Sequence, residues 1–303
     1  MSSADCSTAR TETTGRRDSR PPDVGTLPAC NVRTAPMTPV LVVALLLLGA
    51  FTGLAAGMLG IGGGMLMVPF MSMLLDHIGF PKDEVVKVAI ATSLTTIVFT
   101  SASSVRAHHA RGAVRWDVVR ALAPGILAGS LLAAHFAHAV PGRALAGFFG
   151  LFIGWSALKM IAGRPPAPER ALPGAAGMAA AGGAIGALSA LLGAGGAFIT
   201  VPFLVRRNVP PISAVASSAA CGFPIALAGA LGYMWAGRDL VLPAGTLGYL
   251  YLPALACISA ASVTTAPLGA RLAHSLPTRT LRRIFAALLA ALAVYMLTRA
   301  LRG

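Results

Sequence analysis

The sequence predicts an all-α polytopic membrane protein with about eight transmembrane helices, in two related halves whose first helix is interrupted by glycines. Three observations predict this fold: the composition, the length of the apolar runs and an internal repeat. Of the 303 residues 56% are hydrophobic and only 11% are charged. A soluble domain carries about 25% charged residues. Apolar segments that cross a bilayer explain the deficit.

The apolar runs have the length that a membrane span requires, which is about 20 residues. They are Thr38–Met58 with Met65–Leu75, Val85–Val105, Val118–Ala139, Leu145–Ala162, Ala175–Leu192 with Ala197–Val205, Ser213–Ala236, Ala244–Ala270 and Ile284–Leu301. Counting each glycine-interrupted run once gives eight spans. The stretch Thr38–Leu75 is too long for one straight span, so we expect the chain to re-enter the membrane or to turn back as a hairpin.

The net charge of +14 does not indicate nucleic-acid binding. The basic residues stand at the ends of apolar runs, for example Arg106, Arg111 and Arg279, where cations contact lipid headgroups and set topology. We therefore expect a lipid bilayer as partner and no nucleic acid. With eight crossings, and leaving out the more distant arginines of the N-terminal tail, the basic residues divide 11 to 9 in favour of the side that holds both termini, which favours cytoplasmic termini.

The chain divides into four parts by composition. Residues 1–36 are polar and rich in Ser, Thr, Arg and Pro, which predicts a disordered tail. Alternatively, translation begins at Met37 and the tail is a mis-assigned start. Residues 37–163 form a first membrane repeat, the proline-rich residues 164–173 a linker loop, and residues 174–303 a second membrane repeat.

The repeat is visible when Gly49–Phe70 is placed over Gly182–Phe203. This shift of 133 residues gives nine identities in 22 positions, and the pairs share their spacing. The likeness continues in Ala91-Thr92-Ser93 against Ala216-Ser217-Ser218. We interpret the two halves as products of an ancient duplication, which is common in secondary transporters, whose substrate sites lie near the midplane at broken helices.

The glycine-rich break in each half is the main candidate for a substrate site. Glycine permits left-handed backbone and the close approach of a ligand, and the start of the helix after a break favours an anion. A proline early in each following half-helix opposes one continuous rod. The candidate residues are Gly60, Gly62, Gly63, Gly64 and Pro69 in the first half and Gly193, Gly195, Gly196 and Pro202 in the second.

Hydroxyl side chains on the span after each break are further candidates. Thr92 and Ser93 in the first half match Ser217 and Ser218 in the second, and hydroxyls can donate to an anion. Equally, Ser and Thr in membrane helices bond to their own helix or pack closely. Both readings stay open for these four residues. For Gly49, Gly53 and Gly57, spaced by four, we expect only a close helix–helix seam.

An enzymatic function is not expected. Intramembrane catalysis needs a nucleophile with a base, an acid–base pair or a metal cluster within the spans. The sequence shows none at suitable spacing, and it has no phosphate-binding loop or dinucleotide motif. The four cysteines have no metal-site or redox spacing. We therefore expect no cofactor and no metal site.

The sequence resembles a known family through four stretches. These are Gly53–Phe70 (GLAAGMLGIGGGMLMVPF), its second copy ending in Val201-Pro-Phe203, Ala91-Thr-Ser93, and Pro267–Ala273 (PLGARLA). Together they are similar to the sulfite exporter TauE/SafE family, over Met37–Gly303. The second glycine run differs in having Ala194 and Ala197 where the first has Ile61 and Gly64.

The resemblance implies secondary transport of small anions, such as sulfite, sulfonates or related organosulfur and carboxylate anions, across the bacterial inner membrane. The partner would be a small anionic substrate, and homo-oligomerisation is left open. The competing hypothesis is a non-transporting membrane scaffold or assembly factor, which would not require backbone breaks in both halves.

Overall fold

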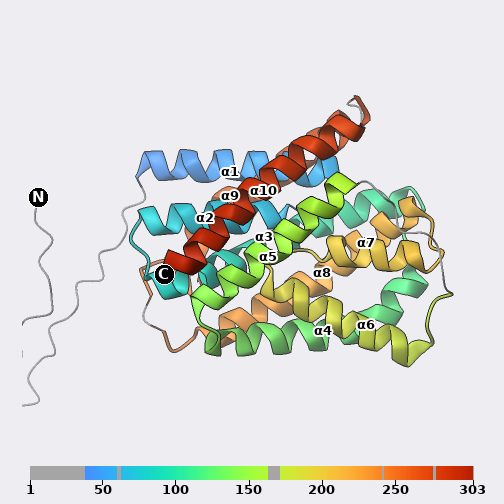
Figure 1. Ribbon diagram of the computed structural model, residues 1–303, viewed down its shortest axis with the longest axis horizontal. Helices are drawn as coiled ribbons and strands as arrows, with labels where there is room; N and C mark the ends of the chain where they lie inside the picture. The colour runs from blue at the N-terminus through green and yellow to red at the C-terminus, as the bar shows by residue number, and fades with distance from the viewer. Residues whose placement is uncertain (1–37, 60–62, 163–170, 241, 276–277, 303) are drawn as a thin grey trace, which may run out of the picture. The chain divides into compact units, whose positions relative to one another are not determined.

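The fold is a bundle of α-helices, which confirms the predicted class (Figure 1). The structure, a computed structural model, describes residues 38–59, 63–162, 171–240, 242–275 and 278–302. The described residues form ten α-helices, a short 3₁₀ helix and one two-stranded hairpin. They are α1 (Pro39–Leu59), α2 (Gly64–His77), α3 (Lys82–Ala110), α4 (Trp116–Phe136), η1 (Ala137–Ala139), α5 (Gly142–Ala162), α6 (Ala175–Leu191), α7 (Ala197–Arg206), α8 (Pro211–Ala236), β1 (Thr246–Leu247), β2 (Leu250–Tyr251), α9 (Leu252–Ser275) and α10 (Thr278–Arg302).

Six of the helices in the described residues are long and apolar enough to cross a membrane: α1, α3, α4, α5, α8 and α10. One predicted boundary is wrong. The span expected over Ala244–Ala270 begins only at Leu252, because Thr246–Leu247 pairs with Leu250–Tyr251 in an antiparallel hairpin. The tail at residues 1–36 and most of the linker at 164–173 lie outside the described residues.

The helix after each glycine-rich stretch runs back along the helix before it instead of continuing it as one rod, so α1 with α2 and α6 with α7 form helical hairpins. At the start of α2, an ideal Cβ on Gly63 would lie 2.8 Å from the Thr52 carbonyl oxygen, in the middle of α1. The rings of Phe51 on α1 and Phe70 on α2 are 5.9 Å apart. In the second half Arg207, just after α7, donates to the carbonyl oxygen of Ala171, just before α6. Thus α2 and α7 each start at mid-depth and return toward the end at which the preceding helix began.

The first helix of each half packs on a helix of the other half. Gly49 and Gly53 of α1 lie against Ile258 and Ser262 of α9 in the same order, so these two helices are parallel. In the same way Gly182 and Gly186 of α6 lie against Leu122 and Ile126 of α4. The seam expected for Gly49 and Gly53 is therefore confirmed, whereas Gly57 has no described surroundings.

The remaining packing places α3 and α8 at the centre. These two helices contact each other, α8 also contacts α4, and α3 contacts α9, while α5 packs on α10. In the most apolar stretch of α3 and of α8 more than half of the residues are buried, whereas in the other four long helices 39% or fewer are. The core of the bundle is therefore built around α3 and α8, the helices that carry the candidate hydroxyls.

Polar contacts define the two ends of the bundle, which we name after the residues at which α3 begins and ends. At the Lys82 end, Arg299 near the end of α10 forms an ion pair with Asp76 of α2 and donates to the Lys82 carbonyl oxygen at 3.4 Å. Also there, the Lys87 ammonium donates to the His138 carbonyl oxygen at 3.1 Å. The Ala110 end holds the starts of α4, α6 and α8. Consequently α1, α3 and α5 run toward the Ala110 end, and α2 and α4 run back toward the Lys82 end. In the second half α6, α8 and α10 run toward the Lys82 end, and α7 and α9 run back toward the Ala110 end.

Candidate functional site

The two glycine breaks meet at the centre of the bundle. An ideal Cβ on Gly64, the first residue of α2, would lie 2.4 Å from the Gly193 carbonyl oxygen and 3.1 Å from the Ala194 Cα. Since contacts this short do not occur in proteins, only glycine fits at position 64 without a shift of one backbone. The close approach brings the start of one half-helix against the break before the other.

The half-helices α2 and α7 begin in the same way. Gly63 precedes α2 with a φ of 63°, and Gly196 precedes α7 with a φ of 76°. Both angles lie in the left-handed region, which glycine adopts without the steric cost that other residues have. The sequence places these two glycines at equivalent positions of the repeat, and the structure gives them the same backbone conformation. Gly60 and Gly62 lie outside the described residues.

Helix α3 supports the meeting point from one side. The Ser93 hydroxyl donates to the Gly193 carbonyl oxygen at 2.9 Å. The Ile97 side chain, one turn later, lies against both breaks, 2.8 Å from an ideal Cβ on Gly64 and 3.4 Å from one on Gly195. Gly193 itself has a φ of 58° and packs against Ile90 of α3. The second break is therefore fixed by α3, a helix of the first half.

Thr92 and Ser217 hold the starts of two other helices. The Thr92 hydroxyl accepts a hydrogen bond from the Tyr251 amide, next to the start of α9, at 3.2 Å. The Ser217 hydroxyl accepts one from the Arg115 amide, next to the start of α4, at 3.0 Å. Both hydroxyls are fully buried. The matched pair thus has a structural role in each half, and a role in substrate binding stays a prediction.

A variant of Thr92 separates the structural role from a binding role. Thr92→Val removes the acceptor of the Tyr251 amide, and we expect the free energy of unfolding to fall by about 1–3 kcal/mol because a buried hydrogen bond is lost. Thr95→Val is the control, since the Thr95 hydroxyl donates to the Ala91 carbonyl oxygen of its own helix and holds no other described helix. Thermal melting in detergent measures the difference. Unchanged stability together with a raised transport KM would instead assign Thr92 to the substrate.

The other predicted residues occupy less informative positions. Pro69 and Pro202 lie inside α2 and α7. Because Pro lacks the amide hydrogen, each leaves one carbonyl of the preceding turn without its usual partner. Ser218 is fully buried on α8, and its hydroxyl has no hydrogen-bond partner within the described part of the chain.

Sequence reasoning missed two hydroxyls near the second break. Ser189 on α6 and Thr200 in the first turns of α7 are fully buried, and neither hydroxyl has a partner in the part of the chain that the structure describes. The Ser189 Oγ lies 2.9 Å from an ideal Cβ on Gly196. Buried polar atoms are usually paired, so these exceptions call for an explanation. In the sequence these two residues could have been found as single polar residues in otherwise apolar stretches.

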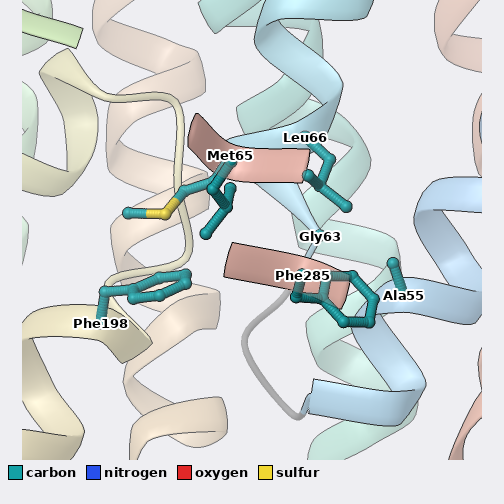
Figure 2. A pocket seen from close by; sticks show the side chains of 7 residues that line it. Ala55, Gly63, Met65, Leu66, Phe198 and Phe285 are labelled. Carbon is teal, nitrogen blue, oxygen red and sulfur yellow. The ribbon is translucent and has the colours of Figure 1, made fainter. Parts of the chain in front are cut away.

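A small cavity of about 20 Å³ lies beside the start of α2, with room for about one water-sized group. Figure 2 shows that Gly63 of the first break and Met65 and Leu66 of α2 line it together with Phe198 of α7 and Phe285 of α10. Ala55 of α1 and Leu289 of α10 complete the lining. These side chains are all apolar, so the polar groups near this cavity are those of the backbone.

A bundle of apolar helices in which two glycine breaks from related halves meet at the centre is typical of a membrane transporter. The comparison with known families gives the same class. The chain belongs to the sulfite exporter TauE/SafE family, whose model matches residues 45–296. This membership confirms the resemblance read from the glycine-rich stretches, and it identifies a transporter rather than an enzyme.

Relatives agree with this class. A Haemophilus influenzae protein named "Probable membrane transporter protein" is 34% identical over 254 residues, which cover 83% of this chain and 96% of the relative. A Methanocaldococcus jannaschii protein, "Probable membrane transporter protein MJ0441", is 24% identical over 84% of this chain and 94% of its own length. No solved structure matches.

Proposed function

We propose that this protein is a secondary transporter that moves small anions, such as sulfite, sulfonates or related organosulfur and carboxylate anions, across the bacterial inner membrane. The observation that carries the proposal is the contact between the two breaks, where the start of α2 lies against the Gly193 carbonyl. In transporters, helix starts at mid-depth are where anionic groups of substrates bind.

The start of α7 offers suitable donors. The first amides of any helix have no intrahelical acceptor, and together with the helix dipole they favour negative charge. The first backbone hydrogen bonds of α7 run from the Ile199 and Thr200 amides to the Gly196 carbonyl oxygen. The amides before them, of Ala197 and Phe198, have no acceptor within α7 and are available to a ligand. These groups, with nearby hydroxyls, would hold the anion.

The two halves would be inverted repeats. Residues 37–163 and 174–303 each supply five described helices in the same order. Each helix of the first half runs in the direction opposite to its counterpart in the second half, α1 opposite to α6 and so on to α5 and α10. We propose that the halves arose by duplication and that rocking of the swapped packing pairs, α1 with α9 and α4 with α6, exposes the breaks alternately to the two sides.

The hairpins change which basic residues share a side. The Ala110 end carries eight described basic residues: Arg106, Arg111, Arg115, Arg120, Lys159, Arg206, Arg207 and Arg283. The Lys82 end carries six: Lys82, Lys87, Arg143, Arg238, Arg299 and Arg302. Because loops rich in Lys and Arg stay in the cytoplasm, we propose that the Ala110 end is cytoplasmic. The start of α1 and the end of α10 then lie on the other side, which is the opposite of the cytoplasmic termini expected from eight crossings.

Cysteine labelling tests this orientation. In a background without native cysteines, we expect a membrane-impermeant maleimide to label Asp239→Cys, at the Lys82 end, in intact cells. Arg111→Cys, at the Ala110 end, should react only after the membrane is opened. Both side chains are exposed, so access to the reagent decides the outcome. The reverse labelling pattern would contradict the proposed orientation.

Transport itself is tested with the purified protein in liposomes. We expect labelled sulfite or methanesulfonate to move down its gradient at a rate that saturates with concentration, and protein-free liposomes measure the leak. If no anion from a panel of sulfite, alkylsulfonates and short carboxylates moves faster than in protein-free liposomes, transport is rejected and the scaffold hypothesis gains support.

A further inference from the structure

The starts of α2 and α7 have the same geometry but different chemistry. Gly63 and Gly196 occupy equivalent positions of the repeat. An ideal Cβ on Gly63 would lie 3.1 Å from the Ala56 Cβ, and one on Gly196 would lie 2.9 Å from the Ser189 Oγ. Ala56 and Ser189 are themselves separated by the repeat shift of 133 residues. A hydroxyl therefore stands at the start of α7 where a methyl group stands at the start of α2.

The first turns of the two half-helices continue this difference. Thr200 of α7 corresponds to Met67 of α2 under the same shift. The Thr200 amide bonds to the Gly196 carbonyl oxygen at 2.9 Å, which places the residue one turn from the break. The hydroxyls of Ser189 and Thr200 are fully buried and have no partner among the described residues. An unpaired buried hydroxyl destabilises the fold, so a ligand that accepts its hydrogen bond would offset that cost.

The start of α2 instead faces the apolar cavity. Gly63 and Leu66 line it, and the rings of Phe285 and Phe198 stand opposite them (Figure 2). Phe198 belongs to the first turn of α7, so both half-helices contribute to the lining of this cavity. Such a lining favours a small apolar group over a charged one.

We propose that the two half-helix starts bind different parts of one substrate. The charged head of the anion binds at the start of α7, to backbone amides and to the hydroxyls of Ser189 and Thr200. The carbon attached to that head occupies the cavity beside the start of α2. The preferred substrate is therefore an organic monoanion with a short apolar group, such as an alkylsulfonate, rather than an inorganic anion such as sulfite. This inference rests on the proposed anion transport and narrows its substrate.

The test compares labelled methanesulfonate with labelled sulfite in liposomes, at a pH at which both are monoanions. We expect the KM of methanesulfonate to be about threefold to fourfold lower, because one carbon becomes buried. Ser189→Ala should raise the KM of both anions by about tenfold or more, since a hydrogen bond to a charged group is lost. Thr200→Val removes the second hydroxyl and should also raise the KM of both anions.

A variant of the cavity separates the two parts of the substrate. Ala55→Val adds carbon atoms to a cavity of only about 20 Å³. We expect it to abolish the preference for methanesulfonate, so that the ratio of the two KM values falls to about one. Ser72→Ala is the control for the hydroxyl variants, since Ser72 is equally buried but its hydroxyl donates to the Val68 carbonyl oxygen of its own helix.

The outcomes distinguish this inference from the proposed function. Transport of both anions with equal KM, or with a lower KM for sulfite, overturns the two-part site but leaves anion transport intact. An unchanged KM in both Ser189→Ala and Thr200→Val also overturns it. If wild-type protein moves neither these anions nor others of the panel, the proposed function fails and the two-part site fails with it.

Discussion

Replacing Gly64 with alanine is expected to reduce transport by about fivefold to a hundredfold. The new Cβ would lie 2.4 Å from the Gly193 carbonyl oxygen and 2.8 Å from the Ile97 Cδ1. A backbone oxygen cannot move aside as a flexible side chain can, so one break must shift away from the other. Overpacking of this kind costs about 1–3 kcal/mol, and each 1.4 kcal/mol corresponds to about a factor of ten. Flux of a labelled anion into liposomes measures the loss.

The control for Gly64→Ala is Gly154→Ala on α5. An ideal Cβ on Gly154 would lie 3.6 Å from the Ala293 Cβ, an ordinary contact distance. Both variants place the same methyl group in a membrane helix, but only one places it between the breaks. Wild-type flux in Gly64→Ala would show that contact between the breaks is not needed for transport.

The largest loss of stability is expected for Gly125→Ala on α4. An ideal Cβ there would lie 1.8 Å from the Ala179 carbonyl oxygen and 2.7 Å from the Gly183 nitrogen. The seam between α4 and α6 brings the two backbones together, as small residues allow in membrane helices. We expect the free energy of unfolding to fall by about 3 kcal/mol, measured as thermal melting in detergent and as the fraction of monodisperse protein.

Gly183→Ala on α6 is the matched control in the same seam. The nearest atom to an ideal Cβ on Gly183 is the Gly125 carbonyl oxygen at 3.7 Å, so the methyl group fits. Equal stability of the two variants would contradict the close approach of α4 and α6. A melting temperature that falls only for Gly125→Ala supports the packing of the first half against the second.

The candidate site was predictable in part because backbone breaks leave a mark in the sequence. Gly63 and Gly196 need a left-handed backbone, and glycine meets that need at equal spacing in both halves. The partners of Thr92 and Ser217 were not predictable, since the Tyr251 and Arg115 amides lie more than 100 residues away in the chain. The position of Ser189 at the second break was not predictable either, because it depends on the contact of its hydroxyl with Gly196.

The sequence by itself determined that the chain lies in a membrane, where its helices run and where the two breaks occur. Those properties follow from local apolarity and from glycine, which act on neighbouring residues only. Tertiary structure decided that the breaks are hairpins, that α1 packs on α9 and α6 on α4, and that Gly64 meets Gly193. Hydropathy has no direction across a bilayer and gives no pairing between helices. Which break approaches which was therefore decided only by the packing of small residues at the seams.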